Sequence, residues 1–435
     1  MADLLELSAR ILDTGATNEL VNRVTQELSE VGDGIAVVES FSHSICFRTE
    51  DGLVAFDASG VATGAAVVEA IRGWSDERLH TLVYTHGHVD HVGGSPAFLA
   101  DAGRRGFPRP EVVAHAAVPA RFSRYRYTDA WNLIINARQF GGVNDRTMSI
   151  GPPVEGRTLP PHFLPDGVAT PDVTYEDRLA LNVGGLHLDL RHGRGETDDH
   201  TWAWVPEHRA ICCGDFLIWH FPNAGNPQKV QRYPGEWAVA LRQMSAMEPD
   251  LLLPAHGLPI AGADRIRSVL EDVAGVLERL VADVVELMNA GADLDEVVHT
   301  VRVPDETLAK PYLRPFYDEP EFVVRNVWRL YGGWWDGNAA RLKPPRDADV
   351  AAEVATLAGG AERLAARARE LADAGDLRLA CQLVEWATQA APDDADLHAV
   401  RRDVYQRRRS AEPSLMSKGI YAAAARTSER HVPDA

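Results

Sequence analysis

The sequence predicts a mixed α/β domain followed by an all-α region, and two observations lead to this fold class. Between about residues 34 and 262, short apolar segments alternate with turns rich in glycine and aspartate, a pattern typical of β-strands. After residue 262, apolar residues recur at steps of three and four, as they do on one face of a helix. A chain of 435 residues is also too long for one compact core, so two or three domains are expected.

The first part of the chain contains the predicted strands. Residues 1–33 are expected to form an N-terminal helical segment, and residues 34–262 the α/β domain. The predicted strands of that domain are GIAVVES, SICFRT, LVAFDAS, LHTLVYTH, LALN, LHLDLRHG, TWAWVP and RAICCGD. The predicted helices are VATGAAVVEAIRGW, VPARFSRYRYT and DAWNLIINARQF. The proline- and glycine-rich stretch at 151–171 is expected to be a long loop that could cover a site.

Residues 263–425 are expected to form a helical domain, followed by a tail at 426–435. One long helix begins this domain and is broken by the segment NAGADL. Alanine-rich helices follow, and the segment ADAGDLRLACQLVEWATQAAPDD is similar to the two antiparallel helices of a tetratricopeptide repeat. Gly375 lies at the turn between these helices, and Pro392 ends the second one.

The composition excludes several kinds of partner. The chain has 44 Lys and Arg residues against 63 Asp and Glu residues, a formal charge of −19, so neither nucleic acid nor an anionic membrane surface is an expected partner. No apolar stretch is long enough for membrane insertion, and the first residues lack the basic and apolar segments of a secretion signal. The four cysteines show no disulfide spacing. We therefore expect a cytoplasmic protein with reduced thiols.

The motif HGHVDH, at residues 86–91, directly follows a predicted buried strand and precedes two glycines. It places three imidazoles and one carboxylate, the usual ligands of first-row metals, within six positions. His86 and His88 point to the same side of an extended backbone, and Asp90 and His91 follow as the chain turns toward a helix. The two glycines permit a tight bend. So many ligands suit two ions a few ångströms apart rather than one.

The segment THGHVDHVGG resembles the signature of the metallo-β-lactamase superfamily. This resemblance implies an αββα sandwich with a dinuclear zinc site at one edge of its two sheets. It also implies further ligands at the ends of later strands, namely Asp215 in RAICCGD as a bridging carboxylate and His256 in LLLPAHG as the last imidazole. The expected ligands of two Zn²⁺ ions are His86, His88, Asp90, His91, Glu196, Asp215 and His256, and Asp90 is also expected to be catalytic.

One expected ligand departs from the common pattern of the superfamily, which has a His followed by Thr before the bridging residue. Here HGRGETDDH places Glu196 in that position, and His192 and His200, four residues to either side, are the alternatives. A glutamate at this position is similar to the alkyl sulfatase branch. The segment YGGWWDGNAARL at 331–342 resembles a motif of that branch. The helices after residue 374 resemble its dimerisation domain, which implies a homodimer.

The segment after Asp215 is a second departure from the alkyl sulfatase pattern, and it leaves the specificity for sulfate esters open. The run Glu-Asn-Ala-Thr-His that alkyl sulfatases carry there is absent from GDFLIWHFPNAGNPQKVQRYPGEW, and only Arg232 keeps the place of an anion-binding arginine. Arg138 is the second candidate, since it follows a helix expected to cover the same pocket. Asn136, one helical turn from Asn132, could face that pocket too. The alternatives are a surface salt bridge for each arginine and a solvated or capping role for the two asparagines.

The summed charge of the expected ligands indicates which class of substrate the site would bind. Three carboxylates and one hydroxide balance two Zn²⁺ ions, which favours a monoanionic sulfate monoester or a neutral ester over a dianionic phosphate. The sequence therefore predicts a dinuclear zinc hydrolase that cleaves an alkyl sulfate, or a similar small-molecule ester with an apolar chain, by a metal-bound hydroxide. The alternatives are a hydrolase of lactones, thioesters or phosphodiesters with the same fold, and a non-catalytic helical scaffold with a structural metal site.

Overall fold

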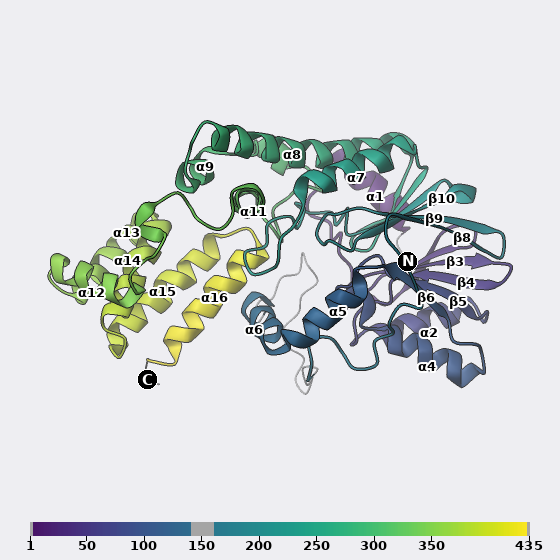
Figure 1. Cartoon of the computed structure of the whole chain (residues 1–435), viewed down its shortest axis with the longest axis horizontal. Coiled ribbons are helices and arrows are strands. Elements are labelled where there is room, and N and C mark those ends of the chain that lie inside the picture. Colours follow the sequence, from purple (N-terminus) through teal and green to yellow (C-terminus); the bar gives the residue numbers. More distant parts are fainter. Residues whose placement is uncertain (1–2, 141–160, 433–435) are drawn as a thin grey trace. The chain divides into compact units, whose positions relative to one another are not determined.

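The computed structural model describes residues 3–140 and 161–432 of the chain. These residues form two compact units (Figure 1). The first unit contains residues 3–133 and 161–334, and the second contains residues 134–140 and 335–432. Each unit has a hydrophobic core of its own.

Two mixed β-sheets form the centre of the first unit. The first sheet follows chain order, with β1 to β4 antiparallel and β4 to β7 parallel. Its strands are β1 (Leu28–Gly32), β2 (Ile35–Val38), β3 (Ser44–Thr49), β4 (Gly52–Phe56), β5 (Leu79–Val83), β6 (Glu111–His115) and β7 (Val173–Tyr175). The second sheet has the order β13-β12-β11-β10-β9-β8, with β11 and β12 parallel and the other neighbours antiparallel. Its strands are β8 (Arg178–Val183), β9 (Leu186–His192), β10 (Thr201–Val205), β11 (Ala210–Gly214), β12 (Leu251–Pro254) and β13 (Ile260–Ala261).

Helices cover the outer faces of both sheets, which gives four layers (Figure 1). Helices α2 (Gly64–Trp74) and α4 (Ser95–Arg105) cover the first sheet, and their apolar faces join a buried cluster with strand residues such as Leu82 and Val112. Helices α7 (Pro234–Ala246) and α8 (Ala263–Asn289) cover the second sheet. This order of layers confirms the predicted αββα sandwich. Helices α5 (Val118–Tyr127) and α6 (Asp129–Phe140) follow β6.

The first compact unit continues beyond Gly262. It includes α8, α9 (Leu294–Thr300), α10 (Asp305–Leu308) and α11 (Pro320–Gly332). The apolar residues at three- and four-residue steps along α8 are buried in the larger core of this unit, as their spacing predicts. The first helices of the expected helical domain thus pack with the two sheets, and the boundary at residue 262 stays a prediction.

The beginning of the chain contains both a helix and a strand. Helix α1 (Leu4–Thr14) starts after Asp3, whose carboxylate accepts a hydrogen bond from the backbone amide of Leu5 (2.9 Å). Strand β1 lies inside the segment expected to be helical, because it pairs with β2 and extends the first sheet. Residues 151–160 of the expected long loop lie outside the described residues, and residues 161–171 form neither helix nor strand.

The second unit is helical, as predicted. It contains α12 (Asp347–Ala358), α13 (Ala361–Asp373), α14 (Leu377–Ala390), α15 (Ala395–Ala411) and α16 (Leu415–Glu429). The turn between α13 and α14 contains Gly375, and Pro392 follows α14. Helix α16 continues into the expected tail as far as Glu429, and Ser428 within that tail is buried. No described helix combines the length and the apolar character needed to span a membrane.

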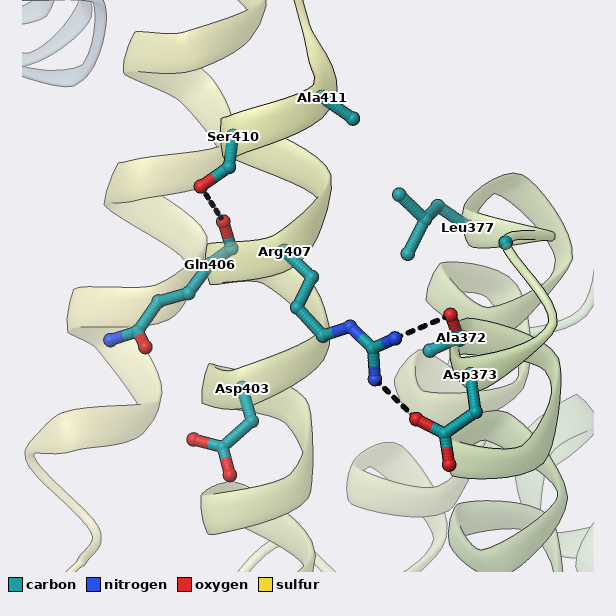
Figure 2. A pocket seen from close by; sticks show the side chains of 9 residues that line it. Ala372, Asp373, Leu377, Asp403, Gln406, Arg407, Ser410 and Ala411 are labelled. Carbon is teal, nitrogen blue, oxygen red and sulfur yellow. Dashed lines mark hydrogen bonds and ion pairs between the residues drawn. The ribbon is translucent and has the colours of Figure 1, made fainter.

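A surface pocket of about 680 Å³ lies between α13 and α15 of this unit (Figure 2). Arg407 crosses it from α15 and donates hydrogen bonds to the carboxylate of Asp373 (2.7 Å) and to the carbonyl of Ala372 (2.6 Å). This ion pair ties α15 to the end of α13. The chemistry predicted from the sequence belongs to the first unit instead.

Candidate metal centre

The loop after β5 carries the first four candidate ligands. The chain leaves the buried strand β5, passes through His86 and His88, and enters the single-turn helix α3 (Val89–Val92). His88 has extended backbone angles (φ −70°, ψ 147°), and its carbonyl accepts a hydrogen bond from the amide of His91 (3.0 Å). This turn brings the ring of His91 to 4.1 Å from the ring of His86, measured between centroids.

One group of possible ligands consists of His86, His88, Glu196 and Asp215. Nε2 of His86 lies 2.9 Å from Nδ1 of His88. Oε1 of Glu196 lies 3.6 Å from Nδ1 of His88, and Oδ2 of Asp215 lies 3.8 Å from Nε2 of His86. Donor atoms of one tetrahedral zinc ion are about 3.3 Å apart when each bond is about 2.0–2.1 Å. The separations in this group scatter around that value.

The second group consists of Asp90, His91 and His256. Oδ2 of Asp90 lies 3.5 Å from Nε2 of His256 and 3.7 Å from Nε2 of His91. Asp215 reaches this group as well, with Oδ2 3.4 Å from His91 Nε2 and Oδ1 3.6 Å from His256 Nε2. The structure therefore brings all seven predicted ligands together and places the carboxylate of Asp215 between the two groups.

The charge states of the histidines differ between the two groups. Burial first, and then the neighbouring His91, His200 and His88, lower the pKa of His86 well below its ordinary value, so its ring is neutral near pH 7. Burial also lowers the pKa of His88. Burial opposes a charge on His91 too, but Asp215 and other nearby carboxylates raise its pKa well above the ordinary value. The carboxylates around His91 thus favour positive charge at this position, which a bound cation would supply.

Residues outside the motif hold His91 in place. Its Nδ1 lies 2.7 Å from Oδ2 of the buried Asp57 and 3.0 Å from the hydroxyl of Ser42. Asp57 also accepts hydrogen bonds from the amide and the hydroxyl of Thr85, both at 2.7 Å. When Nδ1 donates its proton to Asp57, Nε2 of His91 points its lone pair toward Asp90 and Asp215. Asp57 was not predicted from the sequence, although an aspartate at the end of a buried strand is a usable signal.

Two glycines of the motif are needed because other groups approach their backbone closely. A Cβ on Gly87 would lie 2.8 Å from Cδ of Arg121 and 3.0 Å from Oδ2 of Asp199. A Cβ on Gly94 would lie 2.0 Å from the carbonyl oxygen of Ala58. Gly94 has a φ of −83°, which any residue adopts, so close packing and not the expected tight bend requires glycine there.

A buried ion pair supports the backbone between His86 and His88. The carboxylate of Asp199 accepts hydrogen bonds from the amide of Gly87 (3.2 Å) and from Nε of Arg121 (2.5 Å). The side chains of Arg121 and Asp199 are almost completely buried. Neither residue was predicted from the sequence, because Arg121 lies 78 positions from its partner in the chain.

Glu196, rather than either neighbouring histidine, faces the other candidate ligands. Nε2 of His200 accepts a hydrogen bond from the amide of Asp215 (3.1 Å), and its ring stacks on Phe216. His192 stacks on His115 with ring centroids 3.8 Å apart. Burial, together with Asp215 and Asp90 and against the effect of Arg232, raises the pKa of Glu196 to about 7. This geometry favours Glu196 as the ligand.

The first prediction separates Glu196 from His200. We expect Glu196→Gln to lower both zinc affinity and turnover, because the variant keeps the shape of the side chain and loses its charge. Zinc affinity is measured by competition with a chromophoric chelator. In the control variant His200→Gln, both ions should still bind, since His200 faces the amide of Asp215. Full activity in Glu196→Ala together with metal loss in His200→Gln would contradict the assignment.

The predicted anion-binding residues have different surroundings. Arg232 is buried, and its Nη1 lies 2.7 Å from Oε1 of Glu196. Asn136 and Arg138 belong to the second compact unit, so their role in substrate binding stays a prediction. The side-chain amide of Asn132 donates hydrogen bonds to the carbonyl and the hydroxyl of Thr128, so its contacts are local to the start of α6.

The donor atoms of the centre fit a pair of divalent cations. Nε2 of His91 and Oδ1 of Asp215 are buried and have no hydrogen-bond partner within the described residues. Buried polar atoms without a partner are costly, and a cation would satisfy both. Imidazole nitrogens and carboxylate oxygens are ligands that zinc accepts. Side-chain exposure is 21 % for His88, 26 % for Asp90 and 16 % for His256, so the centre opens to solvent on the side of these residues.

Both the α/β part and the helical part of the chain are similar to known proteins. A family model described as the metallo-beta-lactamase superfamily matches residues 38–256, and one described as alkyl sulfatase dimerisation matches residues 293–431. A linear primary-alkylsulfatase from Pseudomonas sp. is 25 % identical over 362 residues, which are 79 % of this chain and 66 % of that protein. An (R)-specific secondary-alkylsulfatase from Pseudomonas sp. is 23 % identical over 81 % of this chain and 54 % of its own length.

Structural similarity extends across most of the chain. The structure of a stereoselective inverting sec-alkylsulfatase from Pseudomonas sp. matches with a TM-score of 0.81 and 22 % identity, and covers 94 % of this chain and 66 % of that protein. At this identity the match shows a shared fold. The chain spans between half and two thirds of the length of the curated relatives.

Proposed function

Because the chain belongs to the alkyl sulfatase branch of the metallo-β-lactamase superfamily, we propose that it is a dinuclear zinc hydrolase that cleaves alkyl sulfate esters. The observation that carries this proposal is the position of Asp215, whose Oδ2 lies 3.8 Å from Nε2 of His86 in one group of ligands and 3.4 Å from Nε2 of His91 in the other. A structural metal site has no use for a second group of ligands that opens to solvent. The names of the relatives supply the substrate class.

Residues on the solvent-exposed side of the centre are suited to orient the attacking water and to contact the substrate. When bound, two zinc ions would supply an activated water and Lewis acidity toward the ester. Asp90 is the most exposed of the three carboxylates, with 26 % of its side chain accessible against 6 % for Asp215 and 4 % for Glu196. Asp90 is therefore the carboxylate that can accept a hydrogen bond from the attacking water and orient it. Phe41 packs edge-on against His256 (5.7 Å between ring centroids) and offers an apolar surface to an alkyl chain.

Lys229 is the cation that we assign to the sulfate group. Burial first, and then Arg232, lower the pKa of Lys229 to about 8, while Glu196 and Asp90 act in the opposite direction. Its ammonium lies 5.6 Å from the ring centroid of Phe163. Because Arg232, Glu196 and Asp90 all influence this pKa, we infer that the ammonium lies close enough to the candidate ligands to reach a bound anion. A monoanionic sulfate would gain a charge-assisted hydrogen bond from it.

We expect Lys229→Met to raise KM for an alkyl sulfate by about 10-fold, since a hydrogen bond to a charged group contributes roughly 1.5–3 kcal/mol. Lys229→Arg should restore part of the affinity. The matched control is Lys310→Met, because Lys310 pairs with Asp272 (2.5 Å). The chain has four lysines, so NMR spectra of reductively ¹³C-methylated protein can also report which one a non-hydrolysable alkyl sulfonate perturbs. Perturbation of another lysine, or an unchanged KM, contradicts the assignment.

An activity screen tests the reaction itself. Zinc-loaded protein is incubated with dodecyl sulfate, a lactone, a thioester and a phosphodiester, and release of sulfate or of the corresponding acid is measured. We expect sulfate release from dodecyl sulfate, and loss of that activity in Asp215→Asn. Hydrolysis of the lactone or thioester alone would replace the proposed substrate class. No hydrolysis by a protein that holds two zinc ions would favour a non-catalytic role.

We also propose that the protein is a cytoplasmic homodimer. The region similar to the alkyl sulfatase dimerisation family, residues 293–431, supports the dimer, and symmetric pairs are the commonest oligomers. The four cysteines are free thiols and three are buried, which fits a reducing compartment. Light scattering of the whole chain should report twice the chain mass of 47.6 kDa. A monomer at micromolar concentration would exclude the dimer.

A further inference from the structure

The loop at residues 223–232 is attached to Glu196 at both of its ends. The side-chain amide of Asn223 donates a hydrogen bond to Oε1 of Glu196. At the other end, Nη1 of Arg232 lies 2.7 Å from the same oxygen. This oxygen is also the one that faces Nδ1 of His88, at 3.6 Å. A hydrogen bond from Asn223 and the ion pair with Arg232, both from one loop, thus converge on Oε1 of the Glu196 carboxylate.

Arg232 also connects the two segments through their backbones. Its Nη1 donates to the carbonyl of Asn223 (2.8 Å) and to the carbonyl of Glu196 (3.1 Å). Only 3 % of the Arg232 side chain and 4 % of the Glu196 side chain are exposed. A buried ion pair in such a position needs several hydrogen bonds to offset its desolvation, and Arg232 makes them with Glu196 and its neighbours.

Hydrogen bonds to Asp318 and Asn326 hold the middle and the end of the loop. The buried carboxylate of Asp318 accepts hydrogen bonds from the amides of Gly225 (2.6 Å) and Asn226 (3.1 Å). The side-chain amide of Asn326, in α11, donates to the carbonyl of Arg232 (3.0 Å). The guanidinium of Arg232 is therefore held in a defined place before any metal or substrate binds.

We propose that Arg232 is a positioning residue, which together with Asn223 holds the Glu196 carboxylate in the orientation that binds the ion shared with His86 and His88. This inference rests on the proposed two-metal function and differs from the predicted role of Arg232 as a contact of the substrate. A carboxylate offers about four acceptor positions, two on each oxygen, so two contacts on Oε1 leave Oε2 of Glu196 for an ion. Without them, Glu196 can adopt other rotamers and must be ordered when the metal binds.

The test measures metal binding rather than turnover. Co²⁺ is titrated into metal-free protein, and visible absorption and calorimetry report the two binding steps. In Arg232→Met we expect one step to weaken by about 10- to 100-fold, as for other residues that support a metal ligand, while the second step stays within about two-fold. Arg232→Lys should be intermediate, because lysine keeps the charge and loses the planar fork. Asn223→Ala removes one donor without changing charge and should weaken the same step less.

Two controls separate positioning from a general loss of structure. Arg329→Met removes a residue that contacts Gln231 and Asn326 behind the loop, and we expect both Co²⁺ steps to be unchanged. In a Glu196→Gln background, Arg232→Met should have little further effect on either step, since the two residues act as one unit. If Arg232→Met does not fold, Asn223→Ala measured in the same two backgrounds decides the question.

The outcomes distinguish this inference from the proposed function. Fewer than two Co²⁺ ions in the unsubstituted protein would overturn the two-metal proposal itself. Two ions in the unsubstituted protein, with both steps unchanged in Arg232→Met, would overturn the positioning role. If the same variant then lost turnover of dodecyl sulfate alone, Arg232 would be a contact of the anion, as the sequence predicts. An equal loss of both ions would mean that Arg232 supports the fold as a whole.

Discussion

Asp215→Asn is expected to lower bound zinc from about two ions per chain to one or none and to abolish detectable hydrolysis. Among the candidate carboxylates of the described residues, only Asp215 has oxygens within 4 Å of histidine nitrogens of both groups, His86 on one side and His91 and His256 on the other. An asparagine has nearly the same shape but is neutral, so each ion would lose a charged ligand. Elemental analysis of purified protein, with a zinc-dependent shift in Tm, measures the effect.

A matched control and a partial variant make this result specific. Asp250→Asn changes an exposed carboxylate at the start of β12, paired with Arg209 on the surface, and should change unfolding free energy by less than about 0.5 kcal/mol. His256→Ala should release one ion and keep the ion shared by His86 and His88. Two ions retained in Asp215→Asn would mean that this residue bridges nothing.

Gly87→Ala is expected to have the second-largest effect, although it adds only one methyl group. The new Cβ would lie 2.8 Å from Cδ of Arg121 and 3.0 Å from Oδ2 of Asp199, and neither group can move away, because each is buried and paired with the other. Overpacking of this kind costs about 1–3 kcal/mol. The loop between His86 and His88 must shift instead, so zinc affinity and turnover should both fall sharply.

The control for Gly87→Ala is Gly103→Ala, in helix α4. A Cβ at residue 103 has no neighbour within 4 Å, and alanine is a better helix former than glycine. We expect Gly103→Ala to raise the free energy of unfolding by about 0.5–1 kcal/mol and to leave zinc binding unchanged. Chemical denaturation and zinc titration of both variants provide the comparison. Unchanged zinc affinity in Gly87→Ala would contradict the proposed effect of the Arg121–Asp199 pair.

The strands of the first unit and the loop at residues 86–91 could be predicted because both depend on local pattern, whereas the order of the layers was implied by the resemblance to the metallo-β-lactamase superfamily. Apolar segments and turn residues identify strands, and a dense run of ligand residues after a buried strand identifies the loop. The choice among His192, Glu196 and His200 could not be made in the same way, since all three lie close together in the chain. The choice depends on the fold, because Nε2 of His200 accepts a hydrogen bond from the backbone amide of Asp215 and is therefore not available to a metal ion.

The residues that support the ligands could not be predicted from the sequence, because their partners lie far away in the chain. Asp199 acts on an amide 112 positions earlier in the chain, and Asp318 on amides more than 90 positions earlier. No period or spacing in the sequence encodes such pairs. Arg232 was identified from its position in the family pattern, but its contact with Glu196 is visible only once the fold brings the two segments together.

The contacts of Asp318 limit how far the chain could be shortened, and how simply the site could be transferred to another protein. Asp318 and Asn326 come from the region after α8, yet they hold the loop that carries Asn223 and Arg232. A fragment ending at residue 262 would keep all seven candidate ligands and lose that support. Grafting the seven ligands onto another αββα scaffold would meet the same difficulty. In an evolutionary comparison, residues 318 and 326 should therefore change together with residues 223 and 232, as parts of one inherited unit.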